Sequence, residues 1–330
     1  MRILGKGSDE IKLDTPKSLI FETGSCKLRS MGEPVGRRDA IFSALRTICP
    51  NDGDLITRSQ LEAFTVNGTP ERIMDIATGI WNPVWADSTL SVLSVPRDKN
   101  KSRYAAIYDD VVTPGGFIRY AYQAGTMQGR NRKLRLAAVT QLPLIVFKTV
   151  APGVFMPYFP AIVVGDFPEQ RCVEIAAFSE ARDVFHGTQV TEFEKRYAQV
   201  VVEKRLHQDQ FRGAVMLAYR ERCAVCSLNH ARLLDAAHIT PDADEDGIAA
   251  VSNGLSLCKI HHAAFDGNFM GISPDYKVHI NRRLLNEVDG PMLKHGLQEM
   301  HGRTLEVPRA RANKPDPDRL AVKFSGFLAS

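Results

Sequence analysis

The 330-residue sequence lacks several features that mark specialised classes of protein. No apolar run approaches the roughly 20 residues that a membrane-spanning helix needs. The segment from Met1 to Leu13 alternates charged and apolar side chains and lacks the apolar core of a secretory signal. We also find no internal repeat and no low-complexity segment. These absences exclude membrane, secreted and repeat proteins, and they predict a cytoplasmic globular protein.

Cysteine is scarce, with six residues in the whole sequence. Cys26, Cys49 and Cys172 stand singly, whereas Cys223, Cys226 and Cys258 lie near histidines. A disulfide framework is not expected in a reducing compartment, where such a cluster is better explained by a bound metal.

The net charge is also small, at +4. It permits a polyanionic partner without requiring one. The local distribution is more informative, because Gly129 to Arg135 reads GRNRKLR and residues 301–330 form a basic C-terminal segment. The first of these segments is either a solvated loop or a site that contacts DNA phosphates. Its candidate phosphate-binding residues are Arg130, Arg132, Lys133 and Arg135.

The order of patterns predicts an α+β protein of two domains. Apolar spacing favours helices at 38–48 and 59–63, then a long helix over 190–219. Between them, short runs rich in Val, Ile, Tyr and Phe are separated by Gly and Pro, which predicts a curled sheet or small β-barrel. These runs cover residues 90–95, 105–108, 117–123, 142–150 and 159–164. We therefore expect a mobile extension at 1–30, a β-barrel domain with flanking helices at 31–185, a helical linker at 186–210, and a second domain at 211–330.

The second domain contains a cluster of metal-binding residue types between Cys223 and Asp266. A closed tetrahedral zinc site commonly consists of two close pairs of ligands. Here the pairs are Cys223 with Cys226 and Cys258 with His261, which together make a Cys3His set. No position is left open for substrate, so the spacing predicts a structural Zn²⁺ that holds a small segment together.

Four further polar residues then remain for chemistry, namely His238, Asn253, His262 and Asp266. His238 ends a predicted strand over 233–239. A second strand is predicted over 255–258, and a helix over 259–266. His262 and Asp266 are four residues apart on that helix and share a face, so both can bind one ion. His261 is rotated away from this face towards the zinc site.

This segment resembles the HNH (ββα-metal) endonucleases, in the variety that carries a zinc-binding C-x2-C and C-x2-[CH] pair. The resemblance implies that His238 is the general base that activates water and that Asn253 orients the water. It also implies that His262 and Asp266 bind one catalytic divalent ion, Mg²⁺ or Mn²⁺. Many family members carry Asp or His immediately before the base, whereas this sequence has Ala237. Asp235, on the same face of the strand, is the candidate substitute ligand.

The first domain also contains weak motifs in a recognisable order, such as G-I-W-N-P from Gly79 and L-P-L-I-V-F from Leu142. With the nuclease segment they resemble predicted restriction endonucleases that carry an N-terminal PUA-like or SRA-like domain. The resemblance implies a curled barrel that reads a flipped base, and hence double-stranded DNA containing 5-methylcytosine or 5-hydroxymethylcytosine as substrate. A flipped base requires aromatic faces and a group that reads its edge. The candidates are Trp81, Tyr108, Asp109, Tyr120 and Tyr122.

Two other hypotheses are consistent with these residues. One is an HNH endonuclease without dependence on modification, and the other is a zinc-containing DNA-binding regulator without catalysis. A monomer has one HNH site and cuts one strand at a time, so a homodimer is one way to cut both strands.

Overall fold

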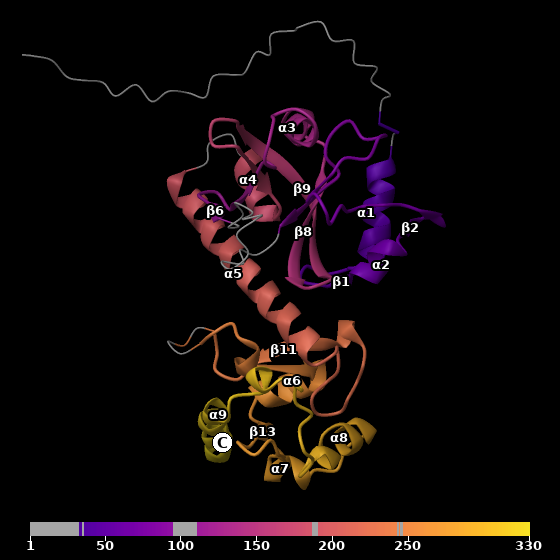
Figure 1. Cartoon of the computed structure of the whole chain (residues 1–330). Helices are drawn as coiled ribbons and strands as arrows, with labels where there is room; N and C mark the ends of the chain where they lie inside the picture. Colours follow the sequence, from indigo (N-terminus) through magenta and orange to yellow (C-terminus); the bar gives the residue numbers. More distant parts are fainter. Residues whose placement is uncertain (1–32, 35, 95–110, 187–190, 243, 245–246) are drawn as a thin grey trace, which may run out of the picture. The chain divides into compact units, whose positions relative to one another are not determined.

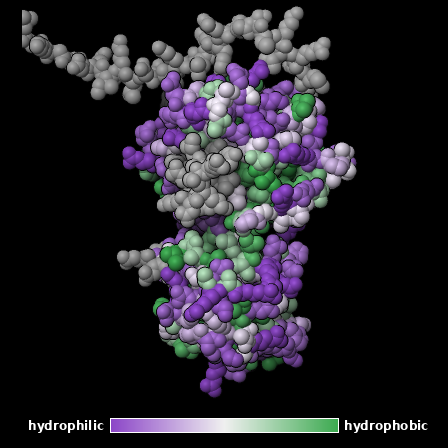
Figure 2. Space-filling view, in the orientation of Figure 1, coloured by the Kyte–Doolittle hydropathy of each residue, from purple (hydrophilic) through white to green (hydrophobic). Residues whose placement is uncertain are grey.

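The computed structural model describes residues 33–34, 36–94, 111–186, 191–242, 244 and 247–330 (Figure 1). The predicted extension at 1–30 and the predicted strand at 105–108 lie outside these residues, as do Tyr108 and Asp109. Within the described part, no helix is both long and apolar enough to cross a membrane. The face shown in Figure 2 is mostly hydrophilic, with smaller hydrophobic patches.

An eight-stranded mixed sheet forms the centre of the N-terminal domain. Its order is β4-β5-β8-β9-β10-β7-β6, and β1 pairs with the start of β9. Strand β5 runs parallel to β8, whereas the other pairs are antiparallel. The bounds are β1 (Ile56–Thr57), β4 (Ile80–Trp81), β5 (Ser91–Ser94), β6 (Val111–Thr113), β7 (Phe117–Ala121), β8 (Leu144–Ala151), β9 (Val154–Phe167) and β10 (Cys172–Ala176). A separate hairpin joins β2 (Thr65–Val66) to β3 (Thr69–Pro70).

The prediction of a closed barrel is wrong for this sheet. Its edge strands β4 and β6 do not pair with each other in the part of the chain that the structure describes. Strand propensity correctly marked most of the extended segments, but it carries no information about which edges meet. The parallel pairing of β5 with β8 also requires a long crossover, which contains β6, β7 and α3 (Arg130–Thr140).

Helices cover both faces of the sheet (Figure 1). Successive residues of a strand point to opposite faces. In β8, Ile145 and Phe147 accordingly enter a core with α1 (Arg37–Ile48) and α2 (Arg58–Glu62). Leu144 and Val146 enter the opposite core, with α3, α4 (Ser179–His186) and the first half of α5 (Glu192–Ala218). Segment 130–135, for which a solvated loop was one expectation, therefore begins a helix packed on the sheet.

Helix α5 contributes to the core of both domains. It begins with a capping box, in which Thr191 and Glu194 satisfy each other's backbone N–H groups. Val202 and Leu206 are buried in the N-terminal core, whereas Phe211 and Val215 are buried in the C-terminal core. A β-carbon on Gly254 would lie 2.5 Å from Val215 Cγ2, so only glycine permits this close approach of α5 to β12 (Gly254–Cys258).

The C-terminal domain consists of short elements around one apolar core. Strands β11 (Leu234–His238) and β12 form a hairpin that leads into α6 (Lys259–Asp266). A second hairpin is formed by β13 (Met270–Ile272) and β14 (Val278–Ile280). The helices that follow are α7 (Arg282–Leu285), α8 (Pro291–Gly296) and α9 (Pro317–Ala329). Single 3-10 turns cover Ala231–Leu233, Val251–Asn253, Gln298–Met300 and Arg311–Asn313.

A buried arginine joins α1 to the sheet. The guanidinium of Arg38 donates to both oxygens of Glu33, at 2.6 and 3.1 Å. It also donates to the carbonyls of Ser88, Thr89 and Pro143, at 2.6 to 3.0 Å. Its side chain is 5% exposed, so these bonds are shielded from water and hold three chain segments together.

We expect Arg38→Ala to lower the free energy of unfolding by about 3–5 kcal/mol, because it leaves a buried carboxylate and three carbonyls without their donor. Arg58→Ala is the matched control. Arg58 is 62% exposed and forms one ion pair within α2, so its loss should cost less than about 1 kcal/mol. Urea unfolding of both variants tests this, and equal losses would contradict the role assigned to Arg38.

Candidate active site and metal centre

The β11–β12 hairpin and α6 bring the predicted chemical residues together. The antiparallel register pairs Leu234 with Cys258 and His238 with Gly254. His238 and Cys258 therefore lie at opposite ends of the hairpin. Helix α6 begins directly after Cys258 and carries His261 and His262 in its first turns. The ββα unit thus holds the candidate base and the ligand candidates Cys258, His261, His262 and Asp266, whereas Cys223 and Cys226 lie in the loop that precedes β11.

Cys223, Cys226, Cys258 and His261 form one cluster, as the spacing predicted. Their ligand atoms all lie within 4.8 Å of one another. His261 Nδ1 lies 3.4 Å from Cys223 Sγ and 3.1 Å from Cys258 Sγ. Sulfur and nitrogen ligands around a tetrahedral zinc ion, with Zn–S bonds of about 2.3 Å, are separated by similar distances. The donor set therefore fits Zn²⁺.

A further contact prepares His261 for this role. Its Nε2 lies 2.8 Å from the carbonyl oxygen of Gly296. A proton donated from Nε2 to that carbonyl leaves the lone pair of Nδ1 directed at the sulfurs. Hydrogen bonds from Cys223 and Cys226 lower the pKa of the Cys258 thiol, while contacts with Cys223 and Cys258 raise the pKa of Cys226. Sulfurs packed this closely do not all ionise unless a cation lies among them.

His238, the candidate general base, is stacked on a phenyl ring. Its imidazole lies 3.8 Å from the ring of Phe211, centroid to centroid, with the planes at 12°. His238 Nε2 is buried and has no hydrogen-bond partner among the residues that the structure describes. Burial lowers the pKa of His238, although the carboxylates of Asp242 and Asp266 oppose this effect. The environment thus favours the neutral imidazole that a general base requires.

Asn253 is fully buried and holds the loop that follows His238. Its Oδ1 accepts from Thr240 N at 2.8 Å, and its Nδ2 donates to the carbonyls of Thr240 and Ile248, both at 3.0 Å. Its backbone carbonyl also accepts from Ile239 N. The amide thus ties Thr240 and Ile248 together, next to His238 in the chain, and the water-orienting role expected from the sequence stays a prediction.

His262 lies between two carboxylates. Its Nδ1 is 3.3 Å from Asp235 Oδ2, and its Nε2 is 3.2 Å from Asp266 Oδ2. A neutral imidazole has one N–H, so it can donate to only one of these groups. When Nδ1–H donates to Asp235, the lone pairs of His262 Nε2 and Asp266 face each other. That arrangement fits a shared divalent cation.

Asp235 is the candidate that we considered as a substitute for a ligand at Ala237. Its Oδ1 lies 2.6 Å from Lys259 Nζ, and Arg212 lies at 3.6 Å. Burial acts to raise the pKa of Asp235, but hydrogen bonds from Lys259 and His262 outweigh it and lower the pKa. The carboxylate is thereby kept ionised and oriented towards His262. Its position suits the fixing of His262 better than direct binding of a metal.

The base-pocket candidates are dispersed among the described residues. Tyr120 and Tyr122 are buried in the N-terminal core, at 1% and 2% exposure. The hydroxyl of Tyr120 donates to Gly79 O, and that of Tyr122 is hydrogen-bonded to Asp166. Trp81 is half-buried, with its Nε1 donating to Arg72 O. Of these three rings, Trp81 is the one that a base could reach in this conformation.

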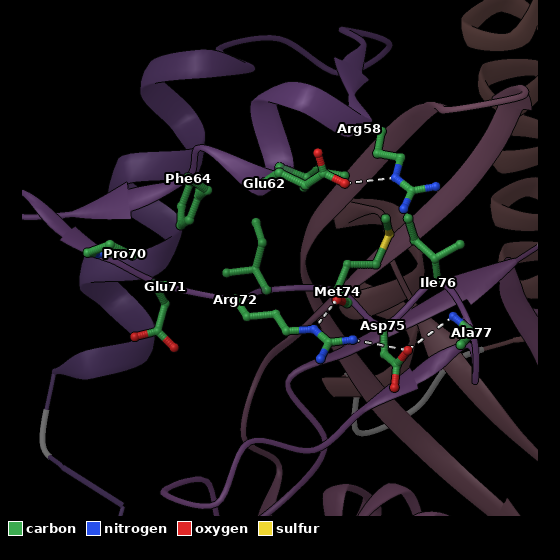
Figure 3. Close-up of a pocket in the computed structure, with 12 residues that line it drawn as sticks. Arg58, Glu62, Phe64, Pro70, Glu71, Arg72, Met74, Asp75, Ile76 and Ala77 are labelled. Atoms are coloured by element: carbon green, nitrogen blue, oxygen red, sulfur yellow. Dashed lines mark hydrogen bonds and ion pairs between the residues drawn. The ribbon is translucent and has the colours of Figure 1, made fainter.

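A cavity of about 600 Å³ is lined by side chains of residues 58–77, among them Arg72 (Figure 3). The guanidinium of Arg72 lines the cavity and stacks over the Trp81 ring at 4.3 Å. Arg58 pairs with Glu62, and Arg72 pairs with Asp75 (Figure 3). The charged groups drawn at its rim thus largely neutralise one another, while its apolar lining includes Phe64 and Met74.

The four candidate phosphate contacts fall into two groups on α3. Arg130 and Arg132 are exposed. Lys133 donates to the carbonyls of Pro83 and Ala86, and Arg135 pairs with Asp166 at 2.9 Å. Lys133 and Arg135 therefore have structural partners, whereas Arg130 and Arg132 extend into solvent.

The sequence argument did not identify Phe211 or Lys259 as site residues. Phe211 belongs to an apolar set typical of any core helix, so its contact with His238 had no separate signal. Lys259 immediately follows the zinc ligand Cys258, and its position at the start of the metal-binding helix was the available clue.

Comparisons with known proteins agree with this geometry. Residues 223–273 match the family model described as HNH endonuclease. A search of curated protein sequences found no match.

Two similar solved structures are restriction enzymes. The chain is 14% identical to the modification-dependent TagI restriction endonuclease, over 84% of this chain and 92% of that one, with a TM-score of 0.28. It is 12% identical to the type IV phosphorothioation-dependent restriction endonuclease ScoMcrA, over 65% and 59%, with a TM-score of 0.25. TM-scores this far below 0.5 do not establish a shared activity.

The family match covers the whole ββα unit, including the cysteine cluster, His238, Asn253 and the metal-binding face of α6. Residues 223–273 belong to the HNH endonuclease family, and the chain that carries them is a nuclease.

Proposed function

We propose that this protein is a DNA endonuclease that hydrolyses phosphodiester bonds by a one-metal mechanism, with His238 as general base. The observation that carries the proposal is the arrangement of His238 beside the His262–Asp266 pair. His238 ends β11, and β12 leads directly into α6, which carries His262 and Asp266, so one ββα unit holds all three side chains. The charges of His262 and Asp266 also act on the pKa of His238, which agrees with this placement. Double-stranded DNA is the proposed substrate.

The protein groups have distinct parts in this reaction. His238 takes the proton from the attacking water, and the Phe211 ring fixes the plane of the imidazole as it does so. Asn253 holds the loop after His238, and Asp235 keeps His262 oriented. His262 and Asp266 would hold a divalent ion, Mg²⁺ or Mn²⁺, and such an ion would supply positive charge to stabilise the phosphorane-like transition state and the leaving 3′ oxygen.

The Cys3His cluster has a separate, structural part. It links the loop at Cys223, the end of β12 and the start of α6, so a bound Zn²⁺ fixes the direction in which α6 leaves the hairpin. That direction determines where His262 and Asp266 lie relative to His238. The zinc therefore supports catalysis through position, with its four ligands leaving no place for substrate.

We further propose that the N-terminal domain restricts cleavage to DNA that carries a modified cytosine, such as 5-methylcytosine or 5-hydroxymethylcytosine. The support is the ordered set of N-terminal motifs and the half-buried Trp81 ring, which stacks with Arg72, a residue that lines a cavity. Trp81 provides the aromatic face that a flipped base requires. With one active site in each chain, a homodimer on DNA would cut both strands.

Replacing His238 by Ala should lower the rate of metal-dependent plasmid nicking by about 10²–10⁴-fold, because the water loses its proton acceptor. The zinc content and the thermal unfolding temperature should stay close to those of the wild type. His207→Ala, an exposed histidine on α5, is the control and should nick normally. A His238→Ala variant that retains full activity would exclude His238 as the base.

Cys258→Ala should remove zinc and unfold the ββα unit, since a structural zinc contributes about 10 kcal/mol or more to folding in small domains. Atomic absorption gives the metal content, and protease sensitivity reports the unfolding. Cys172→Ala also truncates a buried cysteine, but one in the N-terminal sheet, and it should keep its zinc. Retention of zinc by Cys258→Ala would contradict the assigned ligand set.

The wild type should cleave DNA containing 5-methylcytosine or 5-hydroxymethylcytosine faster than unmodified DNA. Trp81→Ala should bring the ratio of these two rates towards one, because base stacking on an aromatic ring contributes about 1–3 kcal/mol. Residual metal-dependent nicking should remain, and Trp81→Phe should restore part of the preference. Equal cleavage of both DNAs by the wild type would refute modification dependence while leaving the nuclease assignment intact.

A further inference from the structure

A second cavity, of about 360 Å³, brings together three arginines that are far apart in the sequence. Arg46 comes from α1, Arg182 from α4 and Arg205 from α5. The lining also includes Asp52 and Ser179. Three guanidinium groups around one cavity repel one another unless negative charge lies between them.

Two of these arginines have a carboxylate within reach. Arg205 Nη2 lies 2.9 Å from Glu180 Oε1. Arg46 Nη1 lies 3.9 Å from Asp52 Oδ1, beyond hydrogen-bonding distance. The Arg46 guanidinium is held in place differently, because it donates to Phe159 O at 2.8 Å and stacks over the Phe159 ring at 4.3 Å.

Arg182 has no carboxylate partner among the residues that the structure describes. Its Nη1 donates to the carbonyls of Pro160 and Ala177, at 2.5 and 3.4 Å. Those bonds fix the guanidinium without neutralising its charge. An arginine has five N–H donors in total, so Arg182 retains donors on Nε and Nη2.

The cavity of about 600 Å³ that Arg58 and Arg72 line provides a contrast. There, Arg58 and Arg72 each have a carboxylate within 3.2 Å (Figure 3). The lining of the three-arginine cavity contains one carboxylate, Asp52, against three guanidinium groups. Glu180 and Asp209 act on Arg205 from outside this lining, so Arg182 is the arginine of the three without a carboxylate among the described residues. Arg46 and Arg182 are also immobilised by carbonyl groups, so little side-chain entropy would be lost when a ligand binds.

We propose that the cavity formed by Arg46, Arg182 and Arg205 binds a phosphate group, and that in function this is a backbone phosphate of the DNA substrate. Phosphate oxygens match the paired N–H donors of guanidinium groups, and a phosphodiester would supply the negative charge that Arg182 lacks. This inference rests on the proposal that DNA is the substrate. It adds a position at which the N-terminal domain would bind the DNA backbone.

Binding of a labelled DNA duplex to the full-length protein tests this proposal. Fluorescence anisotropy measures the binding constant at several NaCl concentrations, without added divalent ion. Arg182→Gln should weaken binding by about 3–10-fold and reduce the slope of log K against log [NaCl] by about 1, as expected for one lost phosphate contact. Arg205→Gln should act in the same direction and does not disturb the carbonyl bonds of Arg182. Arg119→Gln, which alters an arginine that pairs with Glu174 on the sheet, should leave the slope unchanged.

Inorganic phosphate separates the two sources of the ligand. If phosphate raises the unfolding temperature of the wild type but not of Arg182→Gln, while both proteins show the same salt slope on DNA, the cavity takes a free anion and the DNA contact is refuted. If phosphate raises the unfolding temperatures of Arg182→Gln and Arg205→Gln as much as that of the wild type, the site itself is refuted. Metal-dependent nicking by the wild type tests the nuclease proposal separately, so it can succeed while this inference fails.

Discussion

The flat contact between Phe211 and His238 connects α5 to the chemistry of the protein. The ring centroids lie 3.8 Å apart, and the stack buries Nε2 of the imidazole. Because Gly254 has no side chain, α5 comes close enough to the hairpin for this stack to form. The same helix is buried in the N-terminal core through Val202 and Leu206. One rigid element thus joins the core of the sheet to the orientation of the base.

The metal-binding residues depend on this hairpin in a second way. Cys258 ends β12 and is also the N-cap of α6, so the zinc cluster and the catalytic helix share one residue. From there, His261 turns towards the sulfurs and His262 towards Asp235 and Asp266. Two adjacent histidines serve different sites because neighbouring positions on a helix are rotated by about 100°. Within a single helical turn, α6 therefore contributes one histidine to the Cys3His cluster and the next to the pair of carboxylates.

The basic side chains of the N-terminal domain fall into two groups, those bonded within the domain and those that face solvent or a cavity. Arg38 and Lys133 are both bonded to backbone carbonyls and hold segments of the domain together. Arg130 and Arg132 are exposed on α3, and Arg182 lines a cavity together with Arg46 and Arg205. Sequence clustering alone selected Lys133 and Arg135, which have structural partners, and overlooked Arg46, Arg182 and Arg205. Those three residues come together only after the sheet and its helices have formed.

The sequence by itself determined the features that depend on interactions between residues close together in the chain. The C-x2-C and C-x2-H spacings defined the zinc ligands, and helical periodicity located α1, α5 and the shared face of His262 and Asp266. The tertiary structure decided which distant groups meet. It left the sheet open where a barrel was expected, gave Asn253 backbone partners and placed Phe211 against His238. The reason is that strand pairing and side-chain contacts depend on register and packing between segments far apart in the chain, which propensity and spacing do not encode.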